Sequence, residues 1–67
     1  MKHEVTTLNT KMMLAASLKK YMEKKPLAKI TVSEIIRDCG VNRKTFYYHF
    51  DNIYDLMKWM LNREAVD

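Results

Sequence analysis

Apolar residues recur every three or four positions between residues 8 and 25, which predicts an amphipathic helix over that range. The expected core-facing stripe is Leu8, Met12, Ala15, Leu18 and Met22, widened by Leu14 and Tyr21. The opposite, solvent-facing side is expected to carry Asn9, Ser17, Lys20 and Lys24. Pro26 follows, and because a proline disfavours helical geometry in the residue before it, the helix is expected to end there.

A second helix start follows after a short connector. Thr31 and Glu34 have the spacing of a capping box, in which each side chain bonds to the backbone N–H of the other residue. A short helix over residues 32–39 is predicted, and Gly40 stands where a left-handed residue commonly ends a helix. Its inner stripe is Val32, Ile35, Ile36 and Cys39, and the cysteine is interpreted as a small buried hydrophobe.

Two more helices are predicted after the glycine. Asn42 is a favourable N-cap for a helix over residues 43–50, with Phe46 and Phe50 on its inner face and Lys44 and Tyr48 on its outer face. A helix over about residues 52–64 has the core stripe Ile53, Leu56, Met57, Met60 and Leu61. The predicted fold is all-α: a three-helix bundle that contains a helix-turn-helix, plus the start of a fourth helix, in one domain over residues 1–67.

Composition narrows the classes of function. A chain of 67 residues forms one domain at most and is short for an enzyme with a deep, enclosed pocket. One cysteine forms no internal disulfide, and no Cys/His cluster supplies the ligands of a zinc site. No nucleophile–base pair is recognisable, so no catalytic residue, metal or cofactor is expected. No apolar run approaches the roughly 20 residues of a membrane span, which favours a cytoplasmic protein without membrane contact.

The charge is unevenly distributed along the chain. Residues 1–50 contain ten Lys or Arg and four acidic residues, whereas residues 51–67 contain two basic and four acidic residues. This distribution indicates a polyanionic partner for the first fifty residues. A net charge of +4 is also ordinary for a small soluble domain, so charge alone leaves both interpretations open.

The pair of short helices around Gly40 has the form of a helix-turn-helix. In that motif the first helix lies across the DNA backbone and the second helix enters the major groove. Arg43 and Lys44 suit guanine O6 and N7 or a phosphate, and Thr45 suits a thymine methyl or a phosphate oxygen. The polar tips of Tyr47, Tyr48 and His49 suit the oxygens of the DNA backbone.

The run TVSEIIRDCGVNRKTFYYHF, residues 31–50, resembles the DNA-binding domain of TetR-type (tetracycline-repressor-type) transcriptional regulators. The family pattern is a Thr-capped helix, an Ala/Cys-Gly-Val turn and a helix that ends Thr-(Phe/Leu)-Tyr-x-His-Phe. The resemblance extends over roughly residues 8–62 and implies a regulator, acting as a repressor, that binds double-stranded DNA in a sequence-specific way. The following run, residues 51–56, is similar to the subgroup related to regulators of dihydroxyacetone kinase operons.

The resemblance also implies which residues contact DNA. Thr31 and Ser33 match positions that contact phosphate or flank the groove. The base-reading first turn of the recognition helix corresponds to Asn42, Arg43, Lys44 and Thr45. The phosphate-contacting positions are Tyr47 and His49, and Tyr48 adds to either set.

Three departures from the family pattern qualify these expectations. Ile53 stands where many members have a phosphate-binding lysine, and Pro26 stands where many have a glycine. Family members continue into a helical C-terminal domain that dimerises and binds an effector, and these 67 residues lack it. A homodimer is therefore expected for the family, while no small-molecule effector is expected to bind within this chain.

Two other interpretations remain open at this stage. The fourth helix carries Trp59 on its flank together with methionines, so the chain could be a helical protein-interaction module that docks a partner there. The basic, amphipathic first helix could also bind an acidic membrane surface, although the capped pair of helices after it would then have no role. Lys2 and His3 could form an arm near the minor groove or a disordered terminus.

Overall fold

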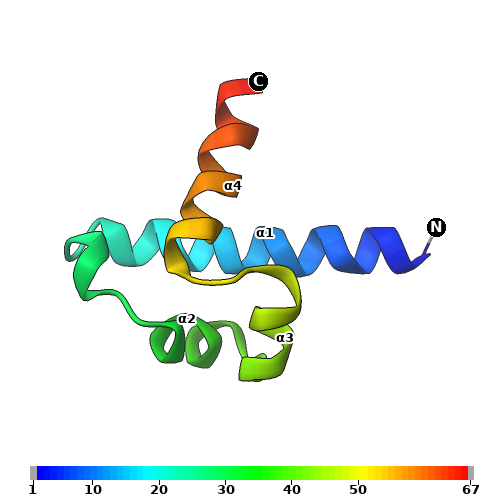
Figure 1. Cartoon of the computed structure of the whole chain (residues 1–67), viewed down its shortest axis with the longest axis horizontal. Coiled ribbons are helices and arrows are strands. Elements are labelled where there is room, and N and C mark those ends of the chain that lie inside the picture. The colour runs from blue at the N-terminus through cyan, green and yellow to red at the C-terminus, as the bar shows by residue number, and fades with distance from the viewer. Residues whose placement is uncertain (1, 67) are drawn as a thin grey trace.

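The computed structural model describes the backbone of residues 2–66 and the side chains of residues 7–63. Its helices are α1 (Lys2–Met22), the short 3-10 helix η1 (Leu27–Lys29), α2 (Val32–Cys39), α3 (Arg43–His49) and α4 (Ile53–Val66). No strand occurs in residues 2–66, so the predicted all-α fold is confirmed for that part of the chain. Figure 1 shows α2 and α3 on one side of α1 and α4 leaving on the other side.

The start of α1 lies further upstream than the hydrophobic pattern predicts, at Lys2 instead of residue 8. The sequence before Leu8 contains no glycine or proline, so nothing in it ends the helix, although no apolar stripe requires the extension. The arm considered for Lys2 and His3 concerns side chains outside the described residues.

The end of α1 comes earlier than predicted, at Met22 instead of residue 25. The backbone N–H groups of Lys24 and Lys25 both turn back to the Tyr21 carbonyl, at 2.9 and 3.0 Å, and form a turn there. This turn takes the chain out of helical geometry before Pro26, which restricts the residue that precedes it.

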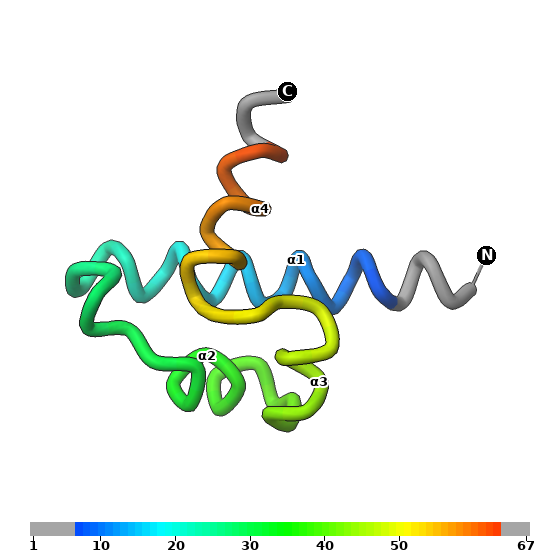
Figure 2. The backbone as a smooth tube through the Cα atoms, in the orientation of Figure 1, coloured from blue at the N-terminus to red at the C-terminus, as the bar shows by residue number. Residues whose placement is uncertain are grey.

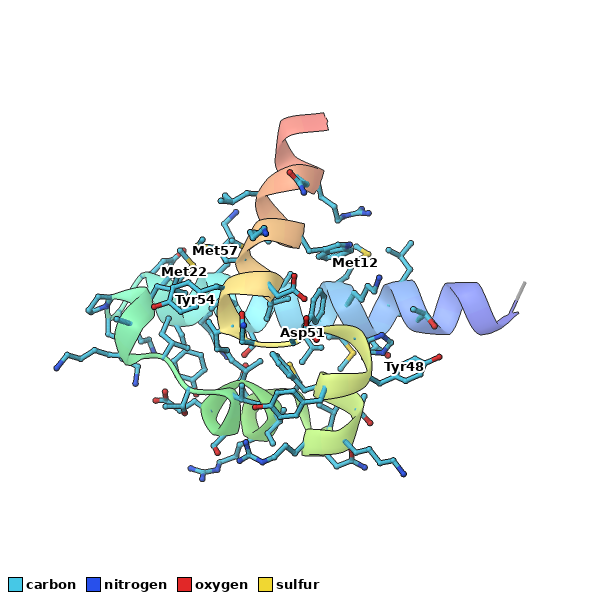
Figure 3. The ribbon with its side chains drawn as sticks, viewed as in Figure 1. Met12, Met22, Tyr48, Asp51, Tyr54 and Met57 are labelled. Atoms are coloured by element: carbon cyan, nitrogen blue, oxygen red, sulfur yellow. The ribbon has the colours of Figure 1, made fainter. Side chains whose placement is uncertain are left out.

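The core-facing side of α1 differs from the prediction. Leu14, Ala15 and Leu18 are buried, but Leu8 is 41% exposed and Met12 is 45% exposed. Met22 is also exposed, and Figure 3 shows Met12 and Met22 at well-separated places along α1. The predicted stripe is therefore confirmed for Leu14, Ala15, Leu18 and Tyr21 and wrong for Leu8, Met12 and Met22. Apolar spacing alone allowed a wider face than the one centred on residues 14 and 18 that the other helices cover.

Ser17 was predicted on the solvent side of α1, yet it is only 4% exposed. Its hydroxyl donates a hydrogen bond to Asp38 Oδ2 at 2.8 Å, and Lys20 Nζ donates to Asp38 Oδ1 at 2.7 Å. A buried hydroxyl is tolerated when it is hydrogen-bonded, which explains how a serine occupies the inner face. These contacts join α1 to the C-terminal end of α2.

The hydrophobic core draws on all four helices. Its fully buried side chains are Leu14 and Leu18 of α1, Ile35 of α2, Phe46 of α3 and Leu56 of α4. Phe50 is 4% exposed, and its ring centroid lies 6.0 Å from that of Phe46, so both phenylalanines pack inward as predicted. Leu61, in contrast, was predicted in the stripe of α4 and is 48% exposed. Cys39 is half-buried, and its Sγ donates to the Met13 carbonyl at 3.3 Å.

Helix α2 is fixed at both ends. Thr31 and Glu34 form the predicted capping box, which satisfies free N–H groups at the start of α2. Gly40 ends α2 in the left-handed region, with φ 74° and ψ 26°, and its N–H bonds to the Ile36 carbonyl at 2.9 Å. Since residues with a Cβ rarely adopt this conformation, glycine suits the position.

The start of α4 is also capped by side chains that accept hydrogen bonds from backbone N–H groups. The N–H of Asp55 donates to Asn52 Oδ1 at 2.8 Å, and the N–H of Asp51 donates to Asp55 Oδ2 at 3.0 Å. α4 therefore begins at Ile53 and extends to Val66, compared with the predicted 52–64, and α3 ends at His49, one residue before the predicted end. In this way the connection leaves α3 and brings the chain back to α1, against which α4 packs (Figure 2).

The ion pairs of α2 predict a loss of stability in acid. The hydrogen bond from Lys20, followed by that from Ser17, lowers the pKa of Asp38 below its usual 3.8. The hydrogen bond from Lys25, followed by that from the Thr31 backbone, lowers the pKa of Glu34 below its usual 4.5. A carboxyl group whose pKa is lower in the folded state stabilises the fold above its unfolded pKa, and this contribution disappears as the pH falls through the folded value.

We therefore expect the free energy of unfolding to decrease as the pH falls below 4.5. Urea denaturation at a series of pH values, followed by circular dichroism, measures this dependence. The double variant Asp38→Asn, Glu34→Gln should show a weaker dependence in the same range. An equal pH dependence for the variant and the parent chain would contradict the assignment.

Candidate nucleic-acid interface

Helix α3 has one buried face and one exposed face. Phe46 is fully buried, whereas Tyr47 is 47% exposed and Tyr48 is 72% exposed. Arg43 and Lys44, in the first turn, are also exposed. Figure 3 shows Tyr48 at the edge of α3, directed away from the core. The helix therefore presents two cationic and two aromatic side chains to solvent while Phe46 holds it against the other helices.

The start of α2 lies beside the start of α3. Thr31 is exposed, and its hydroxyl oxygen accepts a hydrogen bond from the Glu34 N–H at 3.2 Å as part of the cap. The Arg43 guanidinium donates a hydrogen bond to the Ser33 hydroxyl. This contact brings Ser33 of α2 and Arg43 of α3 together, as expected if both helices contribute to one surface.

Asn42 has a structural role that limits what it can offer to DNA. Its Oδ1 accepts a hydrogen bond from the Thr45 N–H at 2.7 Å and so caps α3. The side-chain NH₂ group of Asn42 is the part that remains available to a base or a phosphate. Thr45 itself is half-buried behind the first turn.

The acidic residues of α2 are paired with lysines of the first helix and the turn after it. Asp38 is bound by Lys20, and Glu34 is bound by Lys25. Among the residues with described side chains, Arg37, Arg43 and Lys44 have no carboxylate partner. The exposed cations of α2 and α3 therefore keep their charge available to an anionic ligand, while both carboxylates of α2 are neutralised.

His49 differs from the other predicted contacts because it is half-buried at the end of α3. Burial, followed by the charge of Lys11, lowers the pKa of His49 below its usual 6.5. The imidazole is therefore neutral at pH 7 and offers one N–H donor to a phosphate oxygen. Its ring also contacts that of Tyr48 edge-on, with 5.0 Å between the centroids.

Lys11 of α1 is a candidate contact that the sequence did not single out. Its Nζ lies 5.9 Å from the ring centroid of Phe50 and 5.8 Å from that of Trp59, close to His49. The sequence held one indication that Lys11 faces inward. Position 11 lies three and four residues before Leu14 and Ala15, so the three residues share one face of the helix, and the last two are buried. A lysine on the inner face of a helix was therefore recognisable only once that face was known.

Trp59 of α4 packs against the core instead of standing exposed on the surface. Trp59 is half-buried, and its ring centroid lies 6.0 Å from that of Phe50. The interpretation of Trp59 as an exposed aromatic was wrong, since the ring covers the end of the core and Met60 beside it is 8% exposed. The exposed apolar side chains of α4 are instead Tyr54 and Leu61.

Other kinds of site find little support in the described residues. No group of three or more His, Cys, Asp or Glu side chains that could hold a metal ion occurs there. None of the helices in that part of the chain combines the length and apolar character needed to cross a membrane.

A match to a known family decides what the helix-turn-helix is. The family model for the bacterial regulatory proteins of the tetR family matches residues 14–60, well over half of the chain. The chain belongs to the TetR family. This TetR domain is a DNA-binding regulatory domain and not a catalytic one, in agreement with the sequence prediction for function class. Comparison with curated proteins and with solved structures finds no match.

The TetR match spans the elements that build the interface. It begins at Leu14 in the buried part of α1, includes α2, the turn and α3, and ends at Met60 in α4. The match assigns a general role in DNA binding and transcription regulation, and it gives no support to the narrower subgroup related to dihydroxyacetone kinase operons.

Proposed function

We propose that this TetR-family chain binds double-stranded DNA in a sequence-specific way, with α3 in the major groove, and represses transcription by occupying its site. The observation that carries the proposal is the exposed face of α3, where Arg43, Lys44, Tyr47 and Tyr48 project from a helix anchored by Phe46. A helix enters the major groove with its outward side chains against base edges, and bound protein there obstructs polymerase.

The nine predicted contacts take different parts in this proposal. Lys44 and Arg43 bond to guanine or phosphate, and Ser33 orients the Arg43 guanidinium through the hydrogen bond between them. Tyr48 offers ring surface to the groove. The backbone phosphates on either side are met by Thr31, Thr45, Tyr47 and His49, and Asn42 contributes its NH₂ group.

Two wider features of the proposal follow from the family. Recognition of two half-sites requires two copies of the motif, so we propose a homodimer on DNA, with the dimer contacts outside these residues. A bacterial cytoplasmic location, close to the nucleoid, is where such a regulator acts. The subgroup similarity of residues 51–56 stays a prediction, as does the absence of an effector site in this chain.

Substitution of Lys44 by alanine tests the placement of α3. Selection of binding sites from a random pool of duplexes supplies the probe, and affinity is measured by fluorescence anisotropy on the selected duplex. We expect Lys44→Ala to weaken binding about tenfold, because removing a side chain that bonds to a base edge costs about 1–3 kcal/mol, and to relax selectivity at one base pair. Tyr47→Phe, which removes only the hydroxyl, should weaken binding without changing selectivity.

The matched control is Lys19→Ala, since Lys19 is an exposed lysine of α1 that lines a hollow beside Met12 and Arg63 and is not among the nine predicted contacts. It should bind like the parent chain, and all variants should keep the parent's helical circular dichroism. Amide chemical shifts of α3 that do not move when duplex is added at low salt would refute the proposal.

A further inference from the structure

A hollow lies where the end of α3 meets α1 and α4. Its volume is about 240 Å³, and Phe50 and Trp59 line it together with the polar residues Lys11, His49, Asp55, Lys58 and Asn62. The hollow thus combines α1 with α3 and α4, which come much later in the chain. The hollow is open to solvent. It lies beside the exposed face of α3, since His49, which lines it, is the last residue of that helix and follows the exposed Tyr48.

The cations of the hollow have no carboxylate partner among the described side chains. Lys11 is half-buried, and its ammonium group lies over the rings of Phe50 and Trp59 without an ion pair. Lys58 is exposed on α4, also without one. The single carboxylate is that of Asp55, which accepts the hydrogen bond from the Asp51 N–H at the start of α4. A cation–π contact stabilises a lysine by about 0.5–2 kcal/mol, less than a charge-assisted bond to an anion supplies, so the ammonium group can turn to a phosphate.

The donors in the hollow suit a phosphate group. Lys11 and Lys58 supply charge, Asn62 supplies an amide NH₂, and His49 supplies one N–H in its neutral form. Burial, followed by the charge of Lys11, lowers the pKa of His49, so the lysine and the imidazole act on each other in this hollow. An anion bound there would reverse the effect of Lys11 and raise the pKa of the imidazole.

The position of the hollow selects the source of that phosphate. A helix that lies in the major groove has phosphates of the two strands along its flanks and near its ends. The hollow begins at the last residue of α3, so a strand that flanks this end of the helix would pass beside it. We propose that it binds a backbone phosphate of DNA, with Lys11 of α1 as the principal charged contact and Lys58 of α4 beside it. The proposal rests on the DNA-binding function inferred above and extends the interface to α1 and α4.

The test is the salt dependence of binding to a fluorescently labelled 20-base-pair duplex of mixed sequence, measured with the full chain. The slope of log affinity against log salt decreases by about 0.9 for each phosphate that the protein no longer neutralises. We expect Lys11→Gln to show that decrease. The ratio of its dissociation constant to that of the parent chain should then fall about 3.5-fold between 50 and 200 mM salt. Lys11→Arg, which keeps the charge, should keep the slope of the parent chain.

Arg63→Gln is the matched control. The Arg63 guanidinium carbon also lies over the Trp59 ring, at 5.2 Å from its centroid, but Arg63 does not line this hollow. Both glutamine variants therefore remove a cation from the same ring, and only Lys11→Gln removes the proposed bond to phosphate. Thermal unfolding of each variant shows that the fold is retained under the binding conditions.

A second measurement follows His49 directly. Its imidazole proton shifts, recorded against pH with and without duplex, should give a higher pKa in the complex, and a smaller rise in Lys11→Gln. Equal salt slopes for Lys11→Gln and the parent chain would overturn the assignment of the hollow while leaving DNA binding by α3 intact, provided that Lys44→Ala still weakens binding. Absence of salt-dependent duplex binding by the parent chain would overturn both.

Discussion

Replacing Phe46 by alanine is expected to lower the free energy of unfolding by about 3–5 kcal/mol. Phe46 is fully buried, and its ring contacts those of Tyr47 and Phe50, with centroids 5.2 and 6.0 Å away. Removing a buried phenylalanine side chain costs about 3–5 kcal/mol. A domain of 67 residues has roughly 3–10 kcal/mol of total stability, so this one change removes a large part of it.

The measurement is urea denaturation followed by circular dichroism at 222 nm, compared with the parent chain under the same conditions. Tyr48→Ala is the matched control, because it removes an aromatic ring from the same helix at a position that is 72% exposed. That variant should change the free energy of unfolding by less than about 0.5 kcal/mol. A Phe46→Ala variant that is destabilised by less than about 1 kcal/mol would show that α3 is not anchored as described.

Substitution of Gly40 by valine is expected to cost about 2 kcal/mol of stability. Gly40 has φ 74°, a conformation that costs an L-residue about 1–2 kcal/mol, and a branched Cβ is worse suited still. A Cβ added to Gly40 would meet nothing within 4 Å. The expected cost is therefore a backbone effect, without a contribution from steric clash with neighbouring side chains.

Gly40→Asn tests whether the backbone conformation is the cause of the expected destabilisation. Asparagine adopts the left-handed region more readily than valine, so it should recover a substantial part of the stability in the same denaturation experiment. Equal destabilisation by the valine and asparagine substitutions would point to something other than backbone conformation. DNA binding by the valine variant, measured where it is still folded, would report how far the angle between α2 and α3 depends on this residue.

The elements around the turn were predicted from the sequence because their signals are local. The capping box of Thr31 and Glu34, the glycine at residue 40 and the N-cap Asn42 each depend on residues within a few positions of one another. Such signals set the bounds of α2 and the start of α3 without any knowledge of the tertiary structure. For the same reason Phe46 of α3 and Phe50, the residue after it, were placed correctly in the core.

The orientation of α1 could not be predicted in the same way. Nine of the fifteen residues 8–22 are apolar and they are not confined to one narrow stripe, so the choice of face is made by the helices that pack on it. The pairing of Ser17 with Asp38, across 21 positions of sequence, has no local signal either. The hollow at the end of α3 went unrecognised because Lys11 joins His49 and Lys58 only in the folded chain.

The contact between Ser17 and Asp38 has a consequence for the alignment of α1 on α2. Sliding α1 by one helical turn would bring Met13 or Tyr21 to the place of Ser17. Methionine has no proton to donate, and the phenol group of tyrosine lies too far from its backbone to reach the same carboxylate oxygen. The Ser17–Asp38 hydrogen bond therefore forms in one alignment of α1 on α2, and the same alignment buries Leu14 and Leu18 completely.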